Sequence, residues 1–249
     1  MNLREEIIDL VKRLVSQSED KYFYREPLVR FSSADDPLFK NIKINVGPEH
    51  LYPQEILPEA KTVISFFIPF SEEVVNSNLK EDTVSKEWAE SYVKTNALIN
   101  HISNKIIEFL EQKEIKAATI KATHNYDEKT LKSAWSHRSA AYVAGLGTFG
   151  INRMLITKLG CAGRFGTVIM SQEISPDKRA EEKYCLYHKN GSCLKCVKAC
   201  PVNALSVDDF DRFKCHQRLL DNSKQFTDIG LCDVCGKCVV SCPLAIIDQ

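Results

Sequence analysis

Nine of the ten cysteines lie at or beyond residue 185, and only Cys161 lies upstream. Two segments with an offset of 42 residues match in every cysteine and in the proline that follows. They are Cys193-Leu-Lys-Cys196-Val-Lys-Ala-Cys200-Pro201 and Cys235-Gly-Lys-Cys238-Val-Val-Ser-Cys242-Pro243. Each is C-x2-C-x3-C-P, close to the C-x2-C-x2-C-x3-C-P run with which bacterial ferredoxins bind four-iron clusters. The repeat therefore predicts two 4Fe-4S clusters. Zinc also uses C-x2-C pairs, but zinc does not explain the x3 spacing and the proline.

In the ferredoxin run, the fourth cysteine binds the other cluster. Cys232 supplies the leading cysteine of the second segment, whereas the matching position of the first is Asn190 and the nearest replacement is Cys185. This pattern predicts that cluster one is bound by Cys185, Cys193, Cys196 and Cys242, and cluster two by Cys200, Cys232, Cys235 and Cys238. Cys215 is then left over, and Cys161 is expected to be an inert buried thiol.

The 33 basic and 33 acidic residues among 249 leave no net charge to attract the chain to phosphate backbones, so a nucleic-acid partner is not expected. The N-terminus carries no apolar signal sequence, and no apolar run approaches the roughly 18 residues that would span a bilayer. We therefore expect a cytoplasmic protein with no membrane partner. Disulfides are not expected, since such a chain meets a reducing environment.

Several segments upstream of the cysteines have the periodicity of helices or strands. A helix is expected directly after Asn2, and a second, longer helix is expected where an apolar stripe runs from Trp88 to Leu110. Strands are expected over 61–69, 117–123, 154–157 and 165–170. This succession predicts an α+β fold, an α/β sandwich over residues 1–178. The ferredoxin-like domain would occupy residues 179–249, after the polar stretch Ser175–Arg179.

A literal G-x-G-x-x-G occurs over Gly145–Gly150. Dinucleotide-binding loops follow a strand and open a helix. Here the residues over 131–144 are good helix formers and a strand is expected afterwards, which is the reverse order. The nucleotide interpretation is therefore disfavoured, and the glycines would end the helix and turn the chain.

Three features together resemble the epoxyqueuosine reductase family, which is related to the respiratory reductive dehalogenases. They are Ile56-Leu57-Pro58-Glu-Ala-Lys61-Thr-Val-Ile64, then Arg138 ahead of Ala144-Gly145-Leu146-Gly147-x-x-Gly150-x-Asn152, then the ferredoxin cysteines. The resemblance covers about residue 53 to about residue 245. It implies a nitroreductase-like core that binds base-off cobalamin and receives electrons from two 4Fe-4S clusters. The cofactor-binding residues would be Ala144, Gly145, Leu146, Gly147, Gly150 and Asn152.

The resemblance assigns the cluster ligands differently from the ferredoxin repeat. In the family, an isolated cysteine between the two motifs binds the second cluster. Cys215 would then join Cys200, Cys235 and Cys238, and Cys232 would be surplus. Both assignments remain open, with nine cysteines for eight positions.

The chain departs from the family at the expected proton donor. Counting without gaps places Leu131 at the acidic position, and the nearest acid is Asp127. His137-Arg138 replaces a Glu-Arg pair, so His137, whose ordinary pKa is near physiological pH, is a second candidate for the proton donor. Arg138 could hold an anionic group of the substrate or corrinoid. Arg164, in a glycine-rich stretch, could lie over the same pocket.

The chain ends at Gln249 without the helical-repeat domain with which those enzymes engage tRNA. We therefore expect a reductase of a small-molecule or corrinoid substrate, supplied with electrons by a low-potential donor such as ferredoxin or flavodoxin. Two alternatives are an electron-transfer protein that docks to a partner enzyme, and a reductase that binds flavin in the core.

Overall fold

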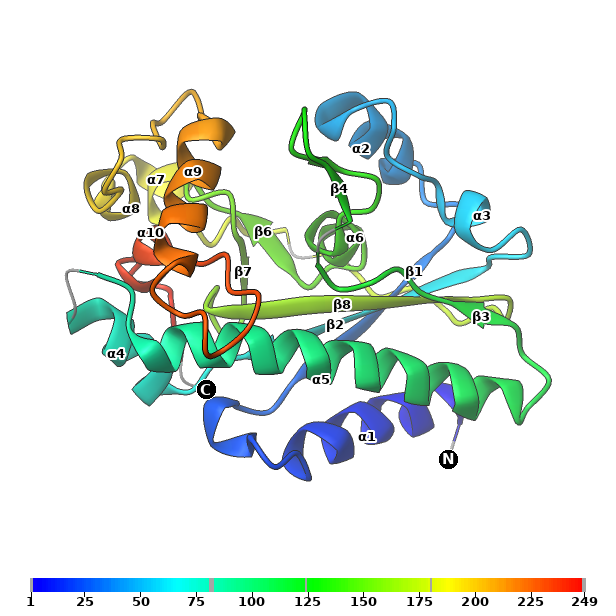
Figure 1. The fold of residues 1–249 in the computed structure, drawn as a ribbon. Coiled ribbons are helices and arrows are strands. Elements are labelled where there is room, and N and C mark those ends of the chain that lie inside the picture. The colour runs from blue at the N-terminus through cyan, green and yellow to red at the C-terminus, as the bar shows by residue number, and fades with distance from the viewer. Residues whose placement is uncertain (1, 81–82, 124, 180, 248–249) are drawn as a thin grey trace.

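The computed structural model describes residues 2–80, 83–123, 125–179 and 181–247. At its centre is a four-stranded antiparallel sheet in the order β1-β2-β8-β3 (Figure 1). The strands are β1 (Leu28–Ser33), β2 (Thr62–Pro69), β8 (Gly163–Met170) and β3 (Ala117–Ala118). The mixed α/β architecture expected from the sequence is confirmed.

β2 is buried along its whole length because helices cover both faces of the sheet (Figure 1). Ile64, Phe66 and Ile68 pack in one apolar cluster, whereas Val63 and Phe67 pack in clusters on the opposite face. Alternate residues of a strand point to opposite faces, so a continuous apolar run is what a strand between two layers requires.

One face is covered by α1 (Leu3–Ser16) and α5 (Lys86–Glu111), with α4 (Glu72–Lys80) beside α5 (Figure 1). The expected start of α1 is confirmed, because Asn2 Oδ1 accepts from the Glu5 backbone N–H at 3.0 Å and the Glu5 carboxylate accepts from the Asn2 N–H at 3.1 Å. A short 3-10 helix, η1 (Lys21–Phe23), links α1 to β1.

The other face carries α6 (His137–Val143), which contacts β2 and β8. Farther out lie α2 (Leu38–Val46) and α3 (Pro53–Ile56). Two small hairpins flank α6 in the sequence: β4 (Tyr126–Asp127) with β5 (Lys132–Ser133), and β6 (Gly147–Phe149) with β7 (Leu155–Thr157).

Two expected elements are shorter than the sequence indicated. The helix expected over 131–144 begins only at His137, because the β4–β5 hairpin occupies the preceding residues and Leu131 has a φ of 53°. The strand expected over 117–123 pairs only at Ala117–Ala118. Helical propensity in 131–136 is thus overridden by a turn in which the Asp127 carboxylate accepts from the Thr130 N–H at 2.8 Å.

The cysteine-rich part carries α7 (Leu186–Asn190), α8 (Lys195–Lys198), α9 (Arg212–Ser223) and α10 (Lys237–Val240). It is not a separate apolar unit, since Val234, Val239 and Val240 share one buried cluster with Trp88 of α5. In the described ranges, we find no helix with the length and apolar character that a bilayer crossing requires.

Candidate functional site

The cysteines of the repeat gather into two groups. The first group lines a small cavity beside Ile151 and Asn152, and consists of Cys185, Cys193, Cys196 and Cys242. The second group lines the wall of a large cavity, and consists of Cys200, Cys215, Cys235 and Cys238. In each group, cysteines from both halves of the repeat meet.

Cys215 and Cys232, which the sequence could not rank, occupy different environments. Cys215 lies on α9 and faces the large cavity with the second group. Cys232 is fully buried, and its Sγ lies 3.6 Å from the backbone carbonyl oxygen of Ala89, to which it donates. The position of Cys215, rather than Cys232, matches the assignment implied by the family resemblance.

Both groups provide the donors that iron–sulfur clusters use. Burial raises the pKa of Cys196 and Cys215 to about 11 and that of Cys238 to about 12, and neighbouring cysteines add to the shift in each case. Because these raised pKa values disfavour the thiolate form, the cysteines need a cationic partner to become thiolates. An iron–sulfur cluster, in which each cysteine binds its own iron, suits four thiols that line one cavity. Within the described ranges, no three His, Cys, Asp or Glu side chains are arranged to hold one metal ion.

Cys161 is fully buried, as expected, but it is not isolated. The contact between the Cys161 and Cys242 side chains raises the pKa of Cys161 and lowers that of Cys242. The Asn152 side-chain amide lies 3.8 Å from the Cys161 Sγ and donates to it. Cys161 therefore packs against Cys242 of the first group and against Asn152.

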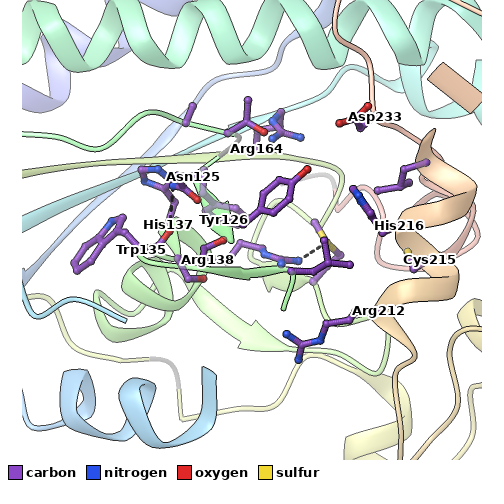
Figure 2. Close-up of a pocket in the computed structure, with 18 of the residues that line it drawn as sticks. Asn125, Tyr126, Trp135, His137, Arg138, Arg164, Arg212, Cys215, His216 and Asp233 are labelled. Carbon is purple, nitrogen blue, oxygen red and sulfur yellow. Dashed lines mark hydrogen bonds between the residues drawn. The ribbon is translucent and has the colours of Figure 1, made fainter. Parts of the chain in front are cut away.

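The large cavity consists of two adjoining volumes of about 420 and 350 Å³ that share Tyr92, Arg138, Met154, Arg164 and Cys215 among their walls. Figure 2 shows side chains from α6, the start of β8, the β4–β5 hairpin and α9 converging on it. Volumes of several hundred Å³ are typical of cofactor and substrate sites. The second cysteine group thus lies in the wall of this candidate site.

Two arginines expected at the site do meet there. Arg138 Nη1 donates to the Arg153 carbonyl at 3.0 Å and to Met154 Sδ at 3.1 Å, and the Arg164 guanidinium lies 4.3 Å from the centre of the Tyr92 ring. Arg138 is exposed and Arg164 is half-buried; desolvation by the surrounding protein lowers the pKa of both arginines, and the charge of Arg164 lowers that of Arg138 further. Neither forms an ion pair with a carboxylate in the part of the chain that the structure describes, and Arg164 Nε lacks an acceptor there. The cavity therefore favours an anionic group.

Sequence reasoning missed several polar residues of this cavity, among them Tyr126, Arg212, His216 and Asp233. The Tyr126 and His216 rings meet edge-on with centroids 5.8 Å apart (Figure 2). A signal existed for α9, since Arg212, Cys215 and His216 are spaced three and four residues apart and therefore share one helix face.

The expectation that His137 titrates near physiological pH is wrong. The side chain is buried, and its Nδ1 lies 2.8 Å from the Thr167 hydroxyl, which accepts from Trp135 Nε1 at 2.9 Å. Its Nε2 lies 3.3 Å from the Lys121 carbonyl, which can only accept, so Nε2 carries a hydrogen. Burial lowers the pKa of His137 to about 4. The imidazole borders the cavity as a neutral, fully hydrogen-bonded group.

Asp127 is exposed on the β4–β5 hairpin and does not line the cavity. Its carboxylate accepts from both the backbone N–H and the hydroxyl of Thr130 at 2.8 Å, and these bonds lower its pKa. In this conformation Asp127 holds the turn, and the neighbouring Tyr126 faces the cavity instead.

The glycine segment contacts protein backbone rather than the large cavity. Gly145, with φ of 78°, ends α6 in a Schellman motif, since its N–H donates to the Tyr142 carbonyl and the Leu146 N–H donates to the Ala141 carbonyl, both at 3.0 Å. A Cβ on Gly145 would lie 2.7 Å from the Lys178 carbonyl oxygen, and one on Gly147 would lie 2.0 Å from that of Ile156. The glycines do lie very close to a neighbour, but that neighbour is the backbone at Lys178 and Ile156.

Of the other residues expected to bind the cofactor, some are buried within the protein and one lines the large cavity. Ala144 and Leu146 are buried, and Gly150 packs against Asn152 and Ile156. Asn152 alone reaches a wall of the large cavity, and it also lines the first cysteine cavity. Its amide donates to the Cys238 carbonyl at 3.4 Å. Asn152 therefore lies between the two cysteine groups.

Comparisons with known proteins find sequence relatives among the epoxyqueuosine reductases. No family model matches the chain. The epoxyqueuosine reductase of Listeria monocytogenes is 28% identical over 234 residues, 89% of this chain and 57% of that protein. That of Lactococcus garvieae is 27% identical over 165 residues, 64% of this chain and 43% of that protein. The chain thus spans about half the length of the curated relatives that it matches.

Solved structures share the fold. The epoxyqueuosine reductase of Streptococcus thermophilus superposes with a TM-score of 0.64 over 100% of this chain and 68% of its own, at 21% identity. The Bacillus subtilis enzyme, described with its catalytic aspartate loop swung out of the active site, gives 0.61 at 20% identity, over 97% of this chain and 65% of its own. A catabolic reductive dehalogenase gives 0.53 at 17% identity, over 76% of this chain and 26% of its own.

Proposed function

We propose that this chain, which is similar to the epoxyqueuosine reductases, is an iron–sulfur reductase that uses cobalamin bound in the large cavity. One observation carries the proposal: Cys200, Cys215, Cys235 and Cys238 open into the same cavity as Arg138 and Arg164. An electron arriving at the second cysteine group is therefore delivered at the wall of the candidate reaction site.

The ligand sets follow from the two groups. Cluster one is assigned to Cys185, Cys193, Cys196 and Cys242, and cluster two to Cys200, Cys215, Cys235 and Cys238. Cys196 and Cys238 also share an apolar cluster, which supports a short path from the first group to the second. Cys232 takes no part in this assignment.

The second volume, about 350 Å³, has a mostly apolar lining with a few polar side chains. Met154, Val239, Leu219 and Phe210 contribute apolar surface, and Arg138 adds a charge in reach of an anionic group. Bound cobalamin would supply a cobalt centre able to pass electrons to a substrate, while the protein orients the substrate and delivers a proton. The glycine segment would act indirectly, by fixing the end of α6 and thereby the position of Arg138.

The proton source is proposed among groups that border the cavity. Tyr126 and His216 face it directly. Asp127 is the alternative, through a movement of the β4–β5 hairpin, and the related Bacillus subtilis structure is described with its catalytic aspartate loop swung out of the active site. His137 is not proposed, because its neutral ring is committed to Thr167 and the Lys121 carbonyl.

A small molecule remains the proposed substrate. The balanced charge, 33 basic and 33 acidic residues, supports it because tRNA binding relies on an excess of positive charge. One solved relative contains a tRNA stem loop, so tRNA is the competing substrate to test. Turnover of an epoxyqueuosine-modified stem loop by the reconstituted chain would overturn this part of the proposal.

The test of the cofactors is anaerobic reconstitution followed by titration with cobalamin and, separately, with flavin. We expect about eight irons per chain, a change in the corrinoid absorption bands and no change in the flavin bands. Arg138→Gln and Arg164→Gln should weaken corrinoid binding, whereas Arg179→Gln, which removes an ion pair with Asp36 away from the cavity, should not. Flavin binding without corrinoid binding would favour the flavin reductase, and eight irons with neither cofactor would favour an electron-transfer protein.

A further inference from the structure

A shallow surface depression lies at the end of the molecule that carries the first cysteine group. Its lining combines apolar and basic side chains, and we name it the lysine face: Leu79, Lys195, Lys198, Ala199, Val240, Ser241, Cys242 and Pro243. Leu79 is 52% exposed and shares this lining with the apolar side chains of Ala199, Val240 and Pro243. The function proposed above does not use this surface.

The lysine face is in direct contact with the first group. Cys242 lines both the depression and the first cysteine cavity. Cys196, of the same group, lies on α8 between Lys195 and Lys198. The large cavity, in contrast, is bordered by the second group. The two groups therefore separate the lysine face from the candidate reaction site.

The charge of the lysine face is uncompensated within the described part of the chain. Lys195 and Lys198 are both exposed, and neither forms an ion pair with a described acid. No acidic residue occurs between Cys193 and Cys200 in the sequence. Lys189 and Lys214, in the same cysteine-rich part of the chain, are each paired with a carboxylate.

We propose that the lysine face is the docking surface for a small acidic one-electron carrier protein of the flavodoxin or ferredoxin type. Leu79, Ala199 and Val240 give the lysine face an apolar part, and Lys195 and Lys198 give it two unpaired positive charges that an acidic partner would complement. Positive charge over the first group would steer an acidic carrier and place its redox centre beside Cys242. This inference rests on the proposed function only in requiring that the cysteines hold clusters.

The step that it implies is a single electron transfer. The reduced carrier loses one electron, the cluster of the first group gains that electron, and no proton or chemical group moves between the proteins. A second electron requires a second encounter or a second reduced carrier. The cluster of the second group then passes electrons inward to the cavity.

The test is stopped-flow reduction of the reconstituted full chain by reduced flavodoxin, followed by bleaching of cluster absorption. In the double variant Lys195→Glu/Lys198→Glu, we expect the second-order rate constant to fall by roughly tenfold or more at low ionic strength, because steering is replaced by repulsion. The wild-type rate should fall with added salt, and the variant should lose that dependence. Leu79→Ser should slow reduction without changing the salt dependence.

The matched control is Lys40→Glu/Lys61→Glu, which makes the same charge change at two exposed lysines remote from the cysteines. Equal rates for the two double variants would overturn the docking proposal. Iron content and reduction by dithionite should be unchanged in every variant, which excludes misfolding as the cause of a slow rate. If wild-type protein is reduced by dithionite but shows no salt-dependent reduction by flavodoxin, docking fails while the clusters stand. Absence of bound iron would instead refute the proposed function.

Discussion

Replacing His137 with glutamine should remove the part of the loss of stability at low pH that arises because the buried histidine is protonated only on unfolding. The neutral ring accepts from Thr167 and donates to the Lys121 carbonyl, and a glutamine amide offers one acceptor and donors for the same two partners. The variant should therefore fold, but it has no group that titrates in the histidine range. We expect its stability to decline less than that of the wild type as the pH falls.

The magnitude follows from the shift in pKa. Burial lowers the pKa of His137 from 6.5 to about 4, so between these values the unfolded state binds the proton and the folded state does not. The stabilising contribution is complete above pH 6.5 and is lost as the pH falls toward 4. At 1.36 kcal/mol per pKa unit, the wild type should lose on the order of 2 kcal/mol more than the variant between pH 7.5 and pH 5.

The assay is anaerobic urea unfolding of both reconstituted proteins at pH 7.5 and pH 5, monitored by tryptophan fluorescence. Taking the difference between the two proteins at each pH cancels contributions from clusters and other titrating groups that they share. His101→Gln, at an exposed histidine of α5, serves as control and should behave as the wild type. If wild type and His137→Gln lose the same free energy of unfolding between the two pH values, the buried neutral imidazole is refuted.

Three further predictions address the cysteines, the glycine segment and the edge of the sheet. Cys215→Ser should reduce the iron content from about eight to about four per chain, whereas Cys232→Ser should leave it unchanged. The reverse result in an iron assay would favour the ferredoxin-type assignment, in which Cys232 binds cluster two. Gly147→Ala should destabilise the protein by roughly 1–3 kcal/mol, more than Gly150→Ala, because the new Cβ meets a backbone oxygen at Gly147 and a movable side chain at Gly150; equal urea midpoints would contradict this. Asp177→Asn should lower the free energy of unfolding by about 2 kcal/mol, because the carboxylate accepts from Arg30 at 2.7 Å and from the Phe31 N–H at 2.8 Å; an unchanged urea midpoint would show that these bonds add nothing.

The sequence determined much about this protein through local patterns. The period of the apolar residues gave α1, α5 and β2, since burial of one face or of both faces imposes that period directly. The cysteine spacing predicted two groups of cysteines, because a short loop brings neighbouring thiols together wherever it is placed. The reversed order around Gly145–Gly150, a helix followed by a strand, was likewise readable from residue types.

Tertiary structure decided which of these groups meet. Cys215 and Cys232 are equally plausible in a linear pattern, but only the path of α9 brings Cys215 to the cavity while Cys232 packs beneath α5. The sequence gives no reason to expect an unusual pKa for His137. Its pKa is lowered because residues far along the chain, such as Thr167, bury the side chain. The arginine pair behaves similarly, because Arg138 and Arg164 lie on different elements and become neighbours only when α6 packs on β8. Spacing fixes local geometry, whereas burial and convergence depend on contacts distant in sequence.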